Sequence, residues 1–204
     1  MRTSIARVQR VLTNRNFRYV LVACGIILLC LALNRVQASR LRQTSAEFTA
    51  EFAQRSPKWG NRGHIIVLFA QPGCPACEEC APKALKLART SNAFSVHVAL
   101  LPRAGSRDSE RICYLSEALQ MLLGPSEELL TLINADKPLS AVEDELRRKG
   151  LDDGFLSRMD SEITRRVVAN VQYAKRFSVE RTPSFFVDGR GPTVGCPDES
   201  SIGP

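Results

Sequence analysis

The stretch HIIVLFAQPGCPACEECAPKALKLART, residues 64–90, predicts the fold of this chain. Residues 64–69 are mostly apolar, rich in β-branched types and bounded by turn formers, which predicts a buried central strand rather than a helix. Gln71-Pro72-Gly73 ends that strand, and a helical stretch from Ala76 to Thr90 follows, interrupted by Pro82. The stretch is therefore a strand–turn–helix unit with two cysteines at its turn.

Cys74 and Cys77 are separated by two residues at the point where the strand passes into the helix. The first turn of a helix presents unpaired N–H groups and a partial positive charge, which favour a thiolate at Cys74. The spacing lets Cys77 reach the Cys74 sulfur, so a mixed disulfide with a substrate can be resolved within the motif. Pro75 stiffens the first turn without removing a donor that the helix needs. The motif predicts thiol–disulfide exchange.

A second part of the site is predicted about a hundred residues later. Thr182-Pro183 precedes the apolar run Ser184–Val187, and Asp188-Gly189 predicts a hairpin turn after it. A cis proline here would place extended backbone beside the two cysteines, where it can hold a substrate peptide as an added strand. A proline at the first residue of a strand is also common without a cis bond.

The remaining pattern predicts one more strand and a block of helices. Residues 94–101 are a second buried strand, whereas 106–176 have helical periodicity. Within the block, Ser140 and Glu143 have capping-box spacing, and the last helix is predicted over 159–177. The fold class is α/β, with strand, active-site helix, strand, helical block and strand in that order.

The basic charge of the chain belongs to its amino-terminal segment. Residues 1–38 contain six arginines and no acidic residue, so 22 basic and 21 acidic residues remain elsewhere, and a nucleic-acid partner is not expected. The apolar run 19–33 follows five of these arginines, as in a signal peptide or a signal anchor. Cleavage after Ala38 or retention in the membrane with the amino terminus inside would both send residues 39–204 across. Residues 39–57 are interpreted as a stalk with a lead-in helix.

The combined motifs resemble the DsbA-like thiol–disulfide oxidoreductases of the thioredoxin superfamily. Cys74-Pro75-Ala76-Cys77, with a proline five residues further on, resembles the thioredoxin active-site pattern, and 182–189 is similar to the cis-proline strand and turn of the family. The helical block at 106–176 resembles the family's helical insertion. The resemblance covers about 57–190 and implies a thioredoxin-like domain over 58–204. It also implies a nucleophilic Cys74, a resolving Cys77 and a peptide groove at Thr182 and Pro183, with Pro75 and Ala76 beside it.

Three features depart from the family pattern. Ala76 stands where strongly oxidising members carry histidine, and Leu68 stands where relatives usually bury an acid that passes protons to the second cysteine. The family normally adds a closing strand and a long helix after the cis proline, whereas here Pro204 follows about 20 residues later. Residues 192–194 are expected to supply a short piece of that strand.

The other cysteines leave alternatives open. Cys80 is either a small buried helix residue or the partner of an alternative disulfide with Cys77 or Cys74. Cys113 and Cys196 are candidates for a structural pair. Cys24 and Cys30 are interpreted as ordinary apolar residues of the membrane segment.

No cofactor or metal is expected. An iron–sulfur cluster would need a further cysteine at residue 84, which is alanine, and no spacing favours a zinc site. His64 and His97 lie in or near apolar strands and are interpreted as structural.

The predicted function is thiol–disulfide exchange with cysteine-containing secreted or membrane proteins, outside the cytoplasm and coupled to a membrane redox partner. A DsbA-like oxidase is favoured over a reductase or isomerase. The alternative from another class is a non-catalytic thioredoxin-like binding module in which Cys74 and Cys77 form a static disulfide.

Overall fold

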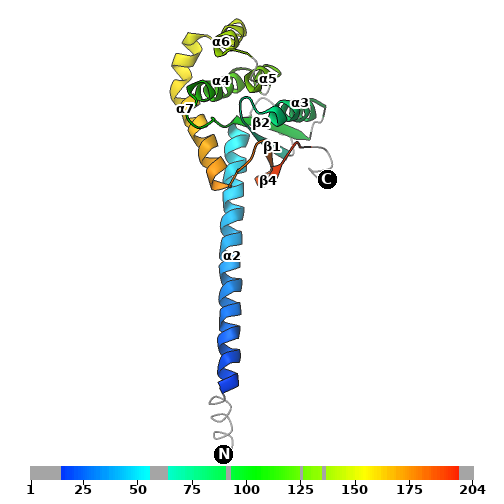
Figure 1. Cartoon of the computed structure of the whole chain (residues 1–204), viewed down its shortest axis with the longest axis vertical. Helices are drawn as coiled ribbons and strands as arrows, with labels where there is room; N and C mark the ends of the chain where they lie inside the picture. Colours follow the sequence, from blue (N-terminus) through cyan, green and yellow to red (C-terminus); the bar gives the residue numbers. More distant parts are fainter. Residues whose placement is uncertain (1–14, 56–63, 91–92, 125, 135–136, 198–204) are drawn as a thin grey trace, which may run out of the picture. The chain divides into compact units, whose positions relative to one another are not determined.

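The described residues contain one four-stranded sheet, which carries the two predicted halves of the site (Figure 1). The computed structural model describes residues 15–55, 64–90, 93–124, 126–134 and 137–197. The strands are β1 (His64–Ala70), β2 (Phe94–Leu100), β3 (Ser184–Val187) and β4 (Arg190–Val194), in the order β2-β1-β3-β4. Strands β1 and β2 are parallel, whereas β3 is antiparallel to both of its neighbours.

Side chains of β1 alternate between two apolar clusters, because successive residues of a strand point to opposite faces. Ile66, Leu68 and Ala70 join the larger cluster, which the helical block and the active-site helix cover. Val67 and Phe69 join a smaller, aromatic cluster on the opposite face. A strand that is buried on both faces has the continuous apolar sequence from which β1 was predicted.

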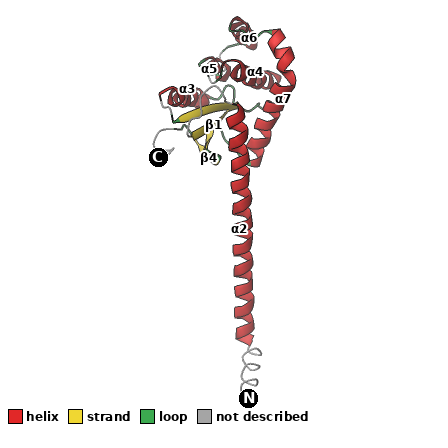
Figure 2. Cartoon of the chain, turned by 180° about the vertical axis from the view of Figure 1, so that it is seen from behind, coloured by secondary structure: helices red, strands yellow, loops and turns green. Residues whose placement is uncertain are grey.

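The active-site helix and the helical block confirm the predicted order of elements. The helices are α3 (Pro75–Thr90), α4 (Arg107–Leu123), α5 (Glu128–Ile133), α6 (Leu139–Arg148) and α7 (Asp153–Arg176). In Figure 2 helices α3 to α6 (red) lie above the small sheet (yellow), and α7 runs down beside it. The block α4–α7 lies between β2 and β3 in the sequence, as an insertion into the sheet unit.

Two helix starts differ from the sequence-based predictions. Helix α7 begins six residues earlier than expected, because Asp152 caps it by accepting a hydrogen bond from the Phe155 N–H at 2.7 Å. Helix α6 begins behind Pro138, so the capping box predicted for Ser140 and Glu143 does not form. The Glu143 carboxylate instead accepts a hydrogen bond from Arg111 at 2.8 Å.

The end of α2 (Arg15–Arg55) belongs to the same compact unit as the sheet. The chain forms two compact units, and the boundary between them lies between residues 44 and 45. Phe48 and Phe52 are fully buried in the aromatic cluster. Phe48 and Phe52 are therefore part of the core.

The part of α2 before residue 45 is a separate unit. Its large apolar side chains are more than half exposed, at Tyr19, Val22, Ile26, Ile27, Leu28, Leu29, Leu31, Leu33 and Val36. No helix within the described ranges, the one that contains residues 19–33 included, is long and apolar enough to span a membrane.

At the outer edge of β2, one side chain pairs with the backbone of Val98. The buried amide of Gln120 accepts a hydrogen bond from the Val98 N–H at 3.1 Å and donates one to the Val98 carbonyl at 2.8 Å. These contacts imitate a neighbouring strand and satisfy backbone groups that would otherwise be exposed at an edge.

The short strand expected at 192–194 is present as part of β4 and begins with a tight approach to β3. A Cβ atom on Gly191 would lie 2.8 Å from the Phe185 carbonyl oxygen, and the residue has φ of +149°. Only glycine fits this position without displacement of the backbone.

Candidate active site

The two cysteines of the motif form a disulfide at the amino end of α3. Cys74 precedes the helix and is partly exposed, whereas Cys77 lies in its first turn and is fully buried. Their Cα atoms are 5.1 Å apart, within the range that disulfides require. Pro75 and Ala76 between them are exposed. A substrate sulfur can therefore approach Cys74, whereas Cys77 is shielded.

Two hydrogen-bond donors contact the Cys74 sulfur. The Cys77 N–H points to this sulfur at 3.3 Å, which is the contact that a helix-capping side chain makes. The Thr182 hydroxyl donates to it at 3.7 Å. Together with the partial positive charge of the helix end, these donors favour the thiolate of Cys74 over the thiol.

Thr182 and Pro183 lie beside the disulfide, joined by a cis peptide bond. The Thr182 carbonyl oxygen is 3.7 Å from the Cys74 sulfur, so backbone of this segment flanks the reactive atom. The Pro183 carbonyl accepts a hydrogen bond from the Gly195 N–H at 2.9 Å, which ties the segment to the chain after β4. The structure thus brings together all six residues that the sequence analysis assigned to the site.

Arg103 is a site residue that the sequence analysis did not identify. Its guanidinium donates to the carbonyl oxygens of Pro72 and Gly73 at 3.4 Å, and so holds the turn that presents Cys74. Gly73 is also fixed from the helical block, because its N–H donates to the Ile133 carbonyl at 2.8 Å. A cation three residues after the end of β2 is the relevant sequence signal, because parallel neighbours end at the same edge of a sheet.

Leu68 occupies the position beside Cys77 where the family pattern has a buried acid. Leu68 is fully buried in β1 and belongs to the same apolar cluster as Cys77. A carboxylate at that position could relay a proton to the buried sulfur, and a leucine cannot.

The remaining described cysteines are free thiols, so the candidate pairs with Cys80 and between Cys113 and Cys196 are not formed. Burial raises the pKa of the Cys113 thiol to about 12, with added repulsion from Glu117 and Glu110. Cys80 is fully buried in α3, and its thiol donates to the Gly195 carbonyl at 3.5 Å.

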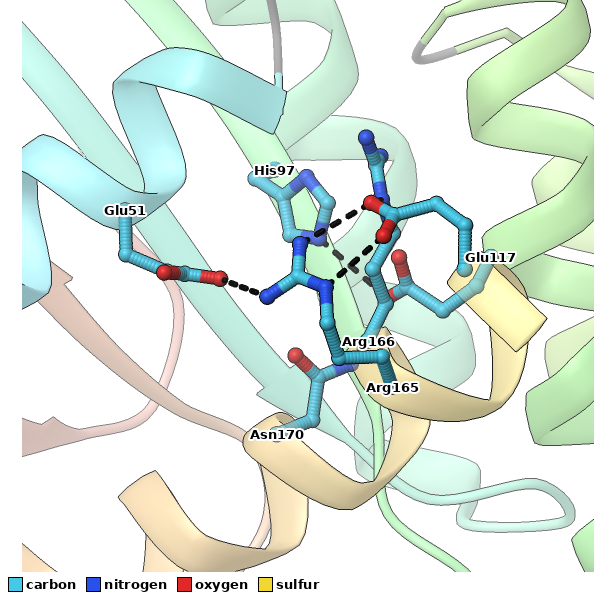
Figure 3. A network of polar contacts seen from close by, with 7 residues as sticks. Glu51, His97, Glu117, Arg165, Arg166 and Asn170 are labelled. Carbon is cyan, nitrogen blue, oxygen red and sulfur yellow. Dashed lines mark hydrogen bonds and ion pairs between the residues drawn. The ribbon is translucent and has the colours of Figure 1, made fainter.

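Both histidines have structural partners. His64 Nδ1 is 2.6 Å from Asp188, whose other oxygen accepts from the Ile65 N–H at 2.9 Å. His97 is buried with its Nε2 3.3 Å from Glu117, and Asn170 donates to the same oxygen at 2.6 Å. Figure 3 shows this network, which links β2, α4 and α7, beside the ion pairs of Glu51, Arg165 and Arg166.

No metal centre is indicated for the part of the chain that the structure describes. It contains no group of three or more histidine, cysteine, aspartate or glutamate side chains placed to hold an ion.

Only the comparison with solved structures finds proteins that are similar to this chain. No protein-family model and no curated protein matches its sequence. A thioredoxin-like oxidoreductase from Silicibacter pomeroyi matches with a TM-score of 0.57 and 19% identity, over 69% of this chain and 83% of that one. The thiol-disulfide exchange protein alpha-DsbA2 from Wolbachia pipientis matches with a TM-score of 0.59 and 13% identity, over 80% and 94%. A periplasmic thioredoxin-like protein from Salmonella enterica serovar Typhimurium matches with a TM-score of 0.52 and 17% identity, over 69% of this chain and 83% of that one.

These identities support a statement about the fold. The chain has a thioredoxin-like fold with a helical insertion, and the structural resemblance to DsbA-like proteins predicted from the sequence is confirmed.

Proposed function

We propose that this protein is an extracytoplasmic thiol–disulfide oxidoreductase that exchanges disulfides with cysteine-containing secreted or membrane proteins. The observation that carries the proposal is the arrangement of Cys74. Cys74 is partly exposed at a helix amino terminus, and its sulfur contacts Thr182 and is joined to that of the buried Cys77. A static disulfide requires none of these features, whereas an exchange site requires an accessible sulfur and a shielded partner.

In the direction that we favour, the protein donates its disulfide. A substrate thiolate attacks the Cys74 sulfur, the Cys74–Cys77 bond breaks, and its electron pair leaves with Cys77, which takes up a proton. A second substrate thiolate then attacks the substrate sulfur of the mixed disulfide and releases Cys74 as a thiolate. The donors around Cys74 stabilise this product, which makes the disulfide more oxidising. A membrane redox partner would then restore the disulfide.

The proposed location rests on two supports. The arginine-rich segment followed by the apolar run 19–33 is typical of a targeting sequence. One of the matching structures is described as periplasmic. An oxidising compartment is also where a disulfide donor has substrates.

Replacement of the resolving cysteine tests the exchange reaction. The full-length Cys77→Ala variant, mixed with a reduced, unfolded secreted protein and glutathione disulfide, should accumulate adducts through Cys74 that a reductant releases. The matched control is the double variant Cys74→Ala/Cys77→Ala, which should form none of them. If Cys77→Ala forms no adduct at Cys74, the binding-module interpretation replaces the enzyme.

The direction of exchange is tested separately by the reduction potential of the wild-type pair. Equilibration with glutathione buffers, alkylation and peptide mapping give the ratio of disulfide to dithiol. A value closer to the −120 mV of strong oxidants than to the −270 mV of thioredoxin is expected for a disulfide donor. A value near about −270 mV would make the protein a reductant.

A further inference from the structure

Two thiols that the proposed exchange does not use lie together behind the active site. Cys80 is one turn after Cys77 on α3 and is fully buried. Its thiol donates to the carbonyl of Gly195 at 3.5 Å, and Gly195 directly precedes Cys196 in the chain. Cys196 is partly exposed and packs against the same apolar cluster. Residues far apart in the sequence therefore form a buried–exposed thiol pair.

The segment that carries Cys196 also contacts the substrate side of the site. Gly195 follows β4 directly, and its N–H donates to the carbonyl of the cis proline Pro183 at 2.9 Å. Gly195 thus bonds through its N–H to the cis-proline segment and through its carbonyl to Cys80. A covalent bond at Cys196 would fix this segment between the two halves of the active site.

We propose that Cys80 and Cys196 are a second redox pair, whose disulfide fastens the chain after β4 to the active-site helix. This pair regulates how firmly the cis-proline segment is held, and it does not itself carry out substrate exchange. The proposal goes beyond the function proposed above and does not depend on it, since neither Cys74 nor Cys77 takes part in forming the bond.

The burial of the two thiols assigns their order of reaction. Desolvation by burial, followed by the neighbouring Cys196 side chain, raises the pKa of the Cys80 thiol. A thiolate is the attacking species, so the accessible Cys196 reacts first with an external disulfide such as glutathione disulfide. Its sulfur bonds to one glutathione and expels the other as a thiolate.

The buried partner then completes the reaction. Cys80 loses its proton and attacks the Cys196 sulfur, which expels the second glutathione thiolate. The two protein thiols are oxidised by two electrons, and one glutathione disulfide becomes two glutathiones, which take up the two protons. No metal or cofactor is needed.

The pair is tested in a full-length chain whose active-site cysteines are replaced, Cys74→Ser/Cys77→Ser. The folded protein is incubated with glutathione disulfide, quenched in acid, denatured, alkylated and digested with trypsin. Peptide 63–83 then contains Cys80 as its only cysteine, and peptide 191–204 contains Cys196. We expect these peptides to appear linked, with a mass two hydrogens below their sum. Addition of Cys196→Ser should abolish the linked product.

A resolving-thiol variant provides the second measurement. With Cys80→Ala in the same background, Cys196 should retain glutathione as a stable mixed disulfide, because no buried thiol displaces it. The Cys113 peptide is the internal control and should be recovered fully alkylated and without glutathione, since that thiol is buried during the incubation. Three outcomes in the Cys74→Ser/Cys77→Ser protein, which retains Cys80, would overturn the proposal. Cys80 could stay reduced while Cys196 is glutathionylated, Cys196 could be linked to Cys113 instead, or neither thiol could react.

Discussion

Phe48→Ala should destabilise the whole domain, although the residue lies in a segment that the sequence suggests is a linker. Its ring is fully buried, with ring centroids 4.6 Å from Phe52, 5.1 Å from Tyr173 and 5.0 Å from Phe186. These neighbours belong to α2, α7 and β3, so they cannot all move to fill the space that is left. Truncation of a buried phenylalanine to alanine costs about 3–5 kcal/mol. For a chain of this size the melting temperature should fall by about 6–20 °C.

Thermal unfolding of the full-length protein, followed by far-UV circular dichroism, measures this effect. The matched control is Gln54→Ala, because Gln54 is exposed on the same helix and the substitution gives the same residue. Substitution of an exposed residue of this kind changes the free energy of unfolding by no more than about 0.5 kcal/mol, so the control should melt within about 2 °C of the wild type. If Phe48→Ala also melted within that range, residues 45–55 would not be part of the folded core.

Three further predictions follow from single groups. Gln120→Leu leaves the Val98 N–H and carbonyl without their side-chain partner and should cost about 1–3 kcal/mol per unsatisfied group in urea unfolding, whereas an unchanged midpoint would contradict its role at the sheet edge. Hydrogen bonds from Arg165 lower the pKa of Glu162 to about 2, so its stabilising contribution is present above about pH 4.5 and is lost as pH falls toward 2. Glu162→Gln should weaken the dependence of the melting temperature on pH in that window. An unaltered dependence would refute the stabilising role of the Glu162 carboxylate. Cys113, with a pKa of about 12, should resist iodoacetamide at pH 8 in the native protein and react after unfolding, as mass spectrometry can show.

Elements with a local signal were predictable from the sequence. Strand β1 has the continuous apolar pattern of a strand that is buried on both faces, and the hairpin after β3 has the Asp188-Gly189 turn with positive φ at both residues. The early start of α7 was missed because Gly154 is a poor helix former, whereas the Asp152 cap outweighs one glycine in the first turn.

Features that depend on tertiary contacts were not predictable in the same way. Phe48 and Phe52 have a helical spacing that fits either an exposed stalk or a core helix, and only their aromatic neighbours decide between the two. The Gln120 side chain gives no sequence signal of a strand edge, because its partner lies 22 residues away.

The active site shows the same division. Cys74 and Cys77 were identified by spacing, and Thr182-Pro183 by its place before a strand. The role of Arg103 and the proximity of Cys80 to Cys196 were not identified. Only the topology of the fold brings the loop after β2 and the segment after β4 to α3. Sequence spacing identifies a motif within one element, whereas contacts between elements require the fold.

The direction of exchange can be argued from the difference between the two active-site sulfurs. The Cys77 sulfur is buried in an apolar cluster with Leu68, an environment that disfavours a thiolate. A reductase must resolve its mixed disulfide by attack of that thiolate, so this step is slow without a nearby proton acceptor. A disulfide donor instead leaves resolution to the second substrate thiol and requires Cys77 only as a leaving group that takes up a proton. Leu68 neither gives a proton to Cys77 as it leaves nor takes one when it attacks, so it slows this step in both directions. The expectation of an oxidising potential rests on the donors at the Cys74 sulfur, which stabilise its thiolate in the reduced protein.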